Sequence, residues 1–219
     1  MIDLTFQQVL KNIKNNKTFT YARYGDGEWN AILGEKGQNC DQHKYFPEMG
    51  SRLKSIIDKK PKYYIGLQSI ANNIYAGRHI EFDRLVAKNK WCSTEIFTEA
   101  SIAGTFNQFF EALVQKNIIF VGNWHTFKNL LQITSTPITI PEIDCWNNYE
   151  KILSELAAKI REYKFDNLII LYSASMMTNV LIDDIYGAYG NALTQIDMGS
   201  VFDPYVGRKT RTYHKTLNI

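Results

Sequence analysis

Apolar and polar positions alternate along the chain in two patterns. Short continuous apolar runs, typical of buried strands, are separated by segments with apolar residues at helical spacing. The expected strands are 19–24, 63–68, 117–122, 167–173 and 192–199, with a short strand near residue 91 and a brief extended piece at 137–141. The expected helices are 4–15, 28–33, 49–60, a short one ending at 131, 148–163 and 176–190, with residues 71–115 mostly helical.

Continuous apolar strands that alternate with helices predict a parallel sheet covered by helices on both faces. No internal repeat, low-complexity linker or break in composition divides the pattern, and 219 residues are enough for one large core. We therefore expect an α/β fold, a Rossmann-like single domain over residues 1–219 with a mostly parallel sheet.

Composition narrows the class of protein. With 45% hydrophobic and 21% charged residues the chain is globular, and a net charge of +3 is too small to indicate nucleic-acid binding by itself. The longest apolar run, 167–174, is too short for a transmembrane helix, and the N-terminal segment lacks the pattern of a secretory signal. Three widely spaced cysteines without a CxxC pair predict reduced thiols. We expect a cytoplasmic protein.

Four polar segments follow expected strands. They are RYGDGE at 23–28, GNWH at 122–125, SASMM at 173–177 and DMGSVFD at 197–203. In parallel sheets ligands bind beyond the carboxyl ends of the strands, and small residues there let a ligand approach the backbone. Backbone N–H groups at the starts of the following helices favour a phosphate. The four segments are therefore the candidate site.

The first segment only partly matches the dinucleotide fingerprint G-x-G-x-x-G. Gly25 and Gly27 fit, but Asn30 replaces the third glycine, and the carboxylates of Asp26 and Glu28 would repel a pyrophosphate. A divalent cation between them removes the repulsion, because Mg²⁺ and Mn²⁺ prefer carboxylate oxygens and bridge to substrate phosphates. The alternative to a metal site is a purely structural role. Asp26 would then be an acid of the turn and Glu28 an acid in the first turn of the helix, where the helix dipole favours a negative charge.

Arginine and acids elsewhere have the same ambiguity. Arg23 could form a strand-edge ion pair or clamp a phosphate with its planar fork. Asp197 and Asp203 could be solvated turn acids, or one of them could orient a sugar hydroxyl or act as a base. His125, a loop histidine at a strand end, is a further candidate base. The histidines are scattered, which argues against a zinc site.

The C-terminal segment is basic and aromatic. Its charged residues Arg208, Lys209, Arg211, His214 and Lys215 could form a solvated face, neutralise a diphosphate leaving group or bind a polyanionic acceptor. The interleaved aromatic side chains could stack on a base or a sugar ring.

The order of these segments resembles a known family. ARYGDGEW near the N-terminus, FVGN after a middle strand, LYSASMMTNVLIDDIYGAYG and then QIDMGSVFD are similar to GT-D type glycosyltransferases. These enzymes are Rossmann-like and include a glucosyltransferase domain that extends glycans on bacterial adhesins. The resemblance spans nearly the whole chain, and its most specific parts are the blocks R-[FY]-G-D-G-E and D-[IM]-G-x-x-x-D.

The resemblance implies a metal-dependent glycosyltransferase that moves a hexose, glucose in particular, from a UDP-sugar to an acceptor hydroxyl. Asp26 and Glu28 would hold Mg²⁺ or Mn²⁺ and act in catalysis with Asp203 as base, or His125 in second place. The residues expected to contact the donor are Arg23, Gly25, Gly27, Gly122, Asn123, Ser173, Ser175, Asp197, Gly199, Arg208 and Arg211.

The acceptor stays open at this point. It could be a glycan, a glycoprotein or a hydroxymethylated base in DNA, the last in keeping with the basic aromatic C-terminal segment. Two alternatives from other classes also remain. One is a noncatalytic nucleotide-binding or nucleic-acid-binding module, and the other is a metal-dependent phosphohydrolase whose carboxylate site combines Asp26, Glu28, Asp197 and Asp203.

Overall fold

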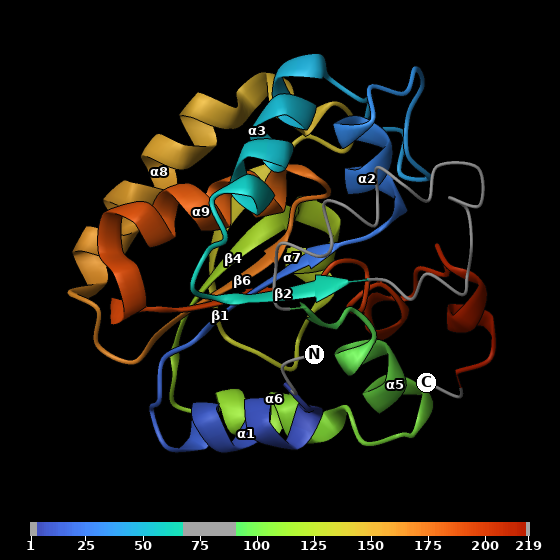
Figure 1. Cartoon of the computed structure of the whole chain (residues 1–219). Helices are drawn as coiled ribbons and strands as arrows, with labels where there is room; N and C mark the ends of the chain where they lie inside the picture. The colour runs from blue at the N-terminus through green and yellow to red at the C-terminus, as the bar shows by residue number, and fades with distance from the viewer. Residues whose placement is uncertain (1–3, 68–90, 218–219) are drawn as a thin grey trace.

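Seven parallel strands form one sheet in the order β3-β2-β1-β7-β6-β4-β5 (Figure 1). The structure is a computed structural model that describes residues 4–67 and 91–217. The strands are β1 (Thr20–Tyr24), β2 (Tyr64–Leu67), β3 (Trp91–Ser93), β4 (Asn117–Asn123), β5 (Thr136–Ile140), β6 (Leu168–Ser173) and β7 (Thr194–Asp197).

Helices cover both faces of the sheet (Figure 1). On one face lie α2 (Asp26–Ile32), α3 (Pro47–Asp58), α8 (Tyr149–Tyr163) and α9 (Met177–Tyr189). On the other face lie α1 (Phe6–Lys14), α5 (Ile96–Ile102), α6 (Asn107–Leu113) and α7 (Trp124–Asn129). Short 3-10 helices are η2 (Cys145–Asn148), η3 (Gly190–Ala192), η4 (Pro204–Val206) and η5 (Thr212–Lys215). The two cores that result confirm the predicted Rossmann-like α/β fold.

Local sequence explains why these helices form where they do. Thr5 caps α1 in a capping box with Gln8, and the apolar stripe of this helix faces the sheet. In α9, by contrast, residues 177–182 are buried in succession. This helix packs on β1 and β7 and also contacts α3 and α8, so its first turns have no solvent-facing side.

The strand order creates a switch point at β1. The chain runs outward from β1 to β2 and β3, then crosses to the other half of the sheet, so β1 lies beside β7, the last strand. The carboxyl ends of β1, β7, β6 and β4 therefore follow one another along one edge. These are the strands that the four polar segments follow.

Some elements differ from the sequence-based expectation. The extended piece at 137–141 is the five-residue strand β5, which tolerates Pro137 because it is the edge strand beyond β4. Of the stretch 71–115, predicted to be mostly helical, residues 71–90 lie outside the described residues, and the remainder forms the predicted strand near Trp91 and two helices. The basic C-terminal segment folds into 3-10 turns.

The three cysteines are free thiols, exposed at Cys40 and buried at Cys92 and Cys145. Within residues 4–67 and 91–217, none of the helices has the length and apolar character needed to cross a bilayer.

Candidate active site at the carboxyl ends of the central strands

The GDGE turn leads directly from β1 into α2. Gly25 is the N-cap, Asp26 is the first helical residue, and Glu28 turns back so that its Oε2 accepts the N–H of Gly25 at 2.8 Å. Asp26 is exposed, whereas Glu28 is half-buried. Glu28 therefore stabilises the helix start, as the structural alternative predicts.

Asp197, at the end of β7, joins the second acidic segment to the first. Its side chain is buried, its Oδ2 accepts the N–H of Arg23 at 3.2 Å, and its Oδ1 accepts the N–H of Gly199 at 2.9 Å. The segments RYGDGE and DMGSVFD, from opposite ends of the chain, thus meet at one point of the sheet edge.

Arg23 is held on the opposite face of the same strand end. Its Nε donates to the carbonyl of Thr94 at 3.1 Å. Gly199 has φ +53°, and a Cβ at this position would lie 1.9 Å from Nη1 of Arg23. A glycine is required here for two reasons, since the backbone is left-handed and the guanidinium occupies the space of a side chain.

Burial dominates the electrostatics of the two acids. Together with the weaker effect of the nearby Asp197 charge, it raises the pKa of Glu28 from 4.5 to about 7. Burial also raises the pKa of Asp197 from 3.8 to about 6, with the guanidinium of Arg23 opposing the effect. Burial therefore disfavours the ionised form of both carboxyl groups, and a cation bound beside them would favour it.

Ser173 and Ser175 follow β6 on the next strand end. The Ser173 hydroxyl is buried and has no hydrogen-bond partner in the part of the chain that the structure describes. Ser175 has φ +53°, and its hydroxyl accepts the side-chain N–H of Asn39 at 2.8 Å. The next residue, Met176, lies against Gly27, where a Cβ would come within 3.3 Å of its side chain. Gly27 thus allows α2 to approach the β6–α9 turn.

At the end of β4 the predicted residues have structural partners. The side chain of Asn123 caps α7 by accepting the N–H of Thr126 at 2.8 Å. Gly122 leaves room for the ring of Phe120, which would lie 2.5 Å from a Cβ. His125 is exposed, and its Nε2 lies 3.4 Å from the carbonyl oxygen of Val206.

The C-terminal segment returns to the site through Asp203 and the arginines. Asp203 accepts a hydrogen bond from the hydroxyl of Thr210, and burial raises its pKa, with Arg208 and Arg211 opposing. Arg211 forms a bidentate pair with Asp41, at 2.9 and 2.6 Å. This ion pair connects the C-terminal segment to the loop that follows α2.

Sequence reasoning missed four residues of this region: Asn39, Asp41, Thr94 and Asn179. Asn179, on α9, donates from its side chain to the carbonyl oxygen of Arg23 at 2.7 Å, and its own Oδ1 is buried without a hydrogen-bond partner among the described residues. The one sequence signal was an amide in the apolar run MMTNVLI. The other three act in loops, where no periodicity marks them.

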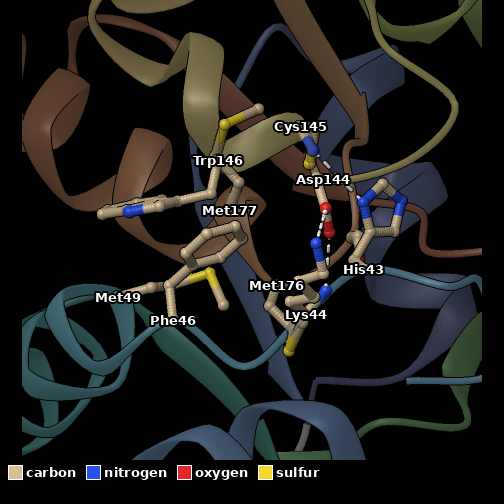
Figure 2. A pocket seen from close by; sticks show the side chains of 10 residues that line it. His43, Lys44, Phe46, Met49, Asp144, Cys145, Trp146, Met176 and Met177 are labelled. Atoms are coloured by element: carbon tan, nitrogen blue, oxygen red, sulfur yellow. Dashed lines mark hydrogen bonds and ion pairs between the residues drawn. The ribbon is translucent and has the colours of Figure 1, made fainter. Parts of the chain in front are cut away.

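Met176, whose side chain lies against Gly27 of the GDGE turn, also lines a hollow (Figure 2). Its lining includes Phe46, Met49, Trp146 and Met177, and it is too narrow to admit a water molecule. Its polar side is closed by the N–H of Cys145, which donates to Nδ1 of His43 at 3.3 Å, and by the Lys44–Asp144 ion pair at 2.9 Å. The hollow is therefore a packed junction between loop 33–46 and η2.

Two solved structures share this arrangement of strands and helices. One, described as the selenomethionine-substituted structure of domain of unknown function 1792, aligns with a TM-score of 0.69 at 19% identity over 92% of this chain and 79% of that chain. The other, described by the statement that the highly conserved domain of unknown function 1792 has a distinct glycosyltransferase fold, aligns with a TM-score of 0.66 at 20% identity over the same shares. This chain has a glycosyltransferase-like fold. No family model and no curated protein matches the sequence.

The acids of this glycosyltransferase-like fold suit a divalent cation only in part. Among the described residues, no group of three or more His, Cys, Asp or Glu side chains could hold a metal ion. Asp26 and Glu28 offer two carboxylates, which is the number that Mg²⁺ commonly takes from a protein when substrate phosphates supply further ligands. The donor set fits a metal shared with a phosphate. It does not fit the four-carboxylate site of the phosphohydrolase alternative.

Proposed function

We propose that the protein is a metal-dependent glycosyltransferase that moves a hexose, glucose in particular, from a UDP-sugar to an acceptor hydroxyl. One observation carries the proposal. The two acidic segments predicted from opposite ends of the sequence are joined by the bond from Arg23 N–H to Asp197, at the carboxyl ends of adjacent central strands. This is where ligands bind in open α/β sheets, and the fold is similar to one described as a glycosyltransferase fold.

Asp26 and Glu28 are the residues that would hold Mg²⁺ or Mn²⁺ beside the donor diphosphate. The cation would neutralise the charge that develops on the leaving UDP. The turn places one exposed and one half-buried carboxylate at the start of α2, so Glu28 can face the protein interior while Asp26 faces the solvent-accessible side.

Arginines and small residues would complete the donor site. Arg23, Arg208 and Arg211 would add positive charge near the diphosphate, although Arg211 would first have to leave Asp41 or share it. The glycines and polar residues at the strand ends would line the donor cleft: Gly25, Gly27, Gly122, Asn123, Ser173, Ser175, Asp197 and Gly199.

For deprotonation of the acceptor hydroxyl we propose Asp203 first and His125 second. Burial raises the pKa of Asp203 toward the range of a general base, while His125 is exposed at the end of β4. The acceptor itself would be a glycan, a glycoprotein or a hydroxymethylated DNA base, encountered in the cytoplasm.

Thermal stabilisation by nucleotides tests this function. We expect UDP to raise the melting temperature only when Mn²⁺ or Mg²⁺ is present, because ligands that bind the native state stabilise it. We also expect hydrolysis or transfer of one sugar in a panel of nucleotide sugars, and a loss of at least about tenfold in turnover for Asp26→Ala and for Glu28→Ala, since each removes an ionic ligand.

Glu48→Gln is the matched control, because Glu48 is an exposed first-turn acid of α3 that does not follow a strand end. It should leave turnover unchanged. Absence of any nucleotide shift across the panel with both metals would contradict the transferase function. Nucleotide binding that survives Asp26→Asn, without turnover, would indicate a binding module, and release of the sugar or phosphate without an acceptor requirement would indicate a hydrolase.

A further inference from the structure

Three side chains surround the backbone at the end of β1. Asp197 accepts the N–H of Arg23 at 3.2 Å, Asn179 donates to the carbonyl of Arg23 at 2.7 Å, and Glu28 accepts the N–H of Gly25 at 2.8 Å. These backbone groups belong to three consecutive peptide units. Side chains from β7, α9 and α2 are therefore brought together within one turn of chain.

Asn179 and Glu28 approach this turn from the same face of the sheet. Both α9 and α2 cover the face whose core includes Ala22 and Tyr24. Because successive side chains of a strand alternate, Arg23 projects to the opposite face, where its Nε donates to a carbonyl oxygen. The guanidinium therefore leaves this side of the turn to the oxygens of Glu28 and Asn179.

Asp197 belongs to the same group. Its neighbours Ile196 and Met198 pack in the core of the opposite face, so alternation turns Asp197 toward α9. Through their bonds to the N–H groups of Arg23 and Gly25, Asp197 and Glu28 are held at peptide units two positions apart at the end of β1.

The amide of Asn179 has an unused acceptor in this group. The residue is fully buried, and its Oδ1 has no hydrogen-bond partner within residues 4–67 and 91–217. The bond from Nδ2 to the Arg23 carbonyl fixes which side of the amide is the oxygen. A buried acceptor without a partner costs free energy, so its retention here points to a ligand that completes it.

The chemistry of the three groups selects the ligand. Two ionised carboxylates and a carboxamide oxygen are acceptors only, so they repel phosphate and other anions. A water molecule could satisfy the amide oxygen but would bring no positive charge to this face of the turn, since the guanidinium of Arg23 lies on the opposite face. Hard divalent cations prefer this set of carboxylate and carboxamide oxygens.

We propose that Glu28, Asp197 and Asn179 together bind one divalent cation, Mg²⁺ or Mn²⁺. The choice of this edge of the sheet rests on the proposed function. The inference adds Asp197 and the Oδ1 of Asn179 to Glu28 as ligands of the ion. Asp26, exposed at the start of α2, would be the ligand most accessible to solvent.

Titration of the full chain with Mn²⁺ alone, followed by electron paramagnetic resonance of the free ion, tests the ligand set without any nucleotide. We expect the wild type to bind Mn²⁺, and Asp197→Asn and Asn179→Leu each to bind at least about tenfold more weakly. Thr20→Val is the matched control. Among the described residues its buried hydroxyl also has no partner, but it lies at the start of β1, away from the carboxyl ends of the strands, so its loss should leave Mn²⁺ affinity unchanged.

Asn179→Asp keeps the result interpretable if the leucine variant does not fold. It exchanges the bond to the Arg23 carbonyl for a third carboxylate, so we expect a lower melting temperature without metal and a larger rise on addition of Mn²⁺ than in the wild type. A purely structural amide predicts the loss of stability without the larger rise.

Two outcomes would overturn the proposal. One is a wild type that binds no Mn²⁺. The other is unchanged Mn²⁺ affinity in Asp197→Asn and Asn179→Leu while Asp26→Asn and Glu28→Gln lose it, which would assign the ion to the Asp-x-Glu pair alone. Nucleotide-sugar turnover is measured separately. If the variants contradict the ligand set but the wild type transfers a sugar, the transferase function is still supported. If Mn²⁺ binds as expected but no sugar is transferred, the ligand set is supported and the transferase function is not.

Discussion

Gly50→Ala is expected to lower the free energy of unfolding by about 3 kcal/mol, at the upper end of the cost of overpacking. Gly50 lies in α3, where a Cβ would come within 2.1 Å of the carbonyl oxygen of Ala31 and 2.8 Å of its carbonyl carbon. Both atoms are backbone atoms of α2, so no side-chain rotation can relieve the overlap. The two helices, which lie side by side above the sheet in Figure 1, would have to separate.

Gly187→Ala supplies a control of opposite sign. Gly187 is an exposed glycine in α9. Apart from its chain neighbours and the backbone of its own helix, no heavy atom of the described residues lies within 4 Å of the place that an alanine methyl group would take. Alanine should therefore raise stability by about 0.5–1 kcal/mol through helix propensity. Urea unfolding of both variants measures the difference. Equal stabilities of Gly50→Ala and the wild type would contradict the close contact of α2 with α3.

The strand and helix order could be predicted because its signals are local. β4 and β6 are buried on both faces and read as continuous apolar runs, which only a covered parallel sheet explains. β5 gave a weaker signal, since it is an edge strand with a proline. The 3-10 turns of the C-terminal segment have no periodicity, and their geometry depends on bonds such as that between Arg211 and Asp41, which are 170 positions apart.

The position of the candidate site could also be predicted from the sequence, but the residues that hydrogen-bond to its predicted members could not. Residues that follow strands must gather at one edge of a parallel sheet, so the meeting of Arg23 with Asp197 is a consequence of strand order. Asn179 carries no such signal, because an amide in an apolar helix looks like a core residue until its oxygen is found without a partner. The roles predicted for the individual site residues stay predictions.

Glu28→Gln is expected to stabilise the protein by about 2–3 kcal/mol at pH 8 in the presence of a chelator. Burial and the charge of Asp197 raise the pKa of Glu28 from 4.5 to about 7, and each pKa unit corresponds to about 1.4 kcal/mol. The expected range lies below the value for the full shift, because the side chain is half-buried and solvent partly screens its charge. Glutamine keeps an oxygen to accept the Gly25 N–H, so the helix start is preserved while the buried charge is removed.

The stabilisation by Glu28→Gln should depend on pH, because it arises from the raised pKa of Glu28. Between pH 4.5 and about 7 the folded protein holds a proton on Glu28 that the unfolded chain has lost, so its stability decreases as the pH rises through this range and the cost is complete above it. The advantage of Glu28→Gln should therefore vanish near pH 4.5 and grow to its full size above pH 7, as measured by urea unfolding across that range. Glu48→Gln, which changes an exposed first-turn acid, should show no such growth. A Glu28→Gln variant that is less stable than the wild type at pH 8 would mean that the carboxylate is compensated within the protein itself, and the electrostatic reason to place a cation beside Glu28 would be lost.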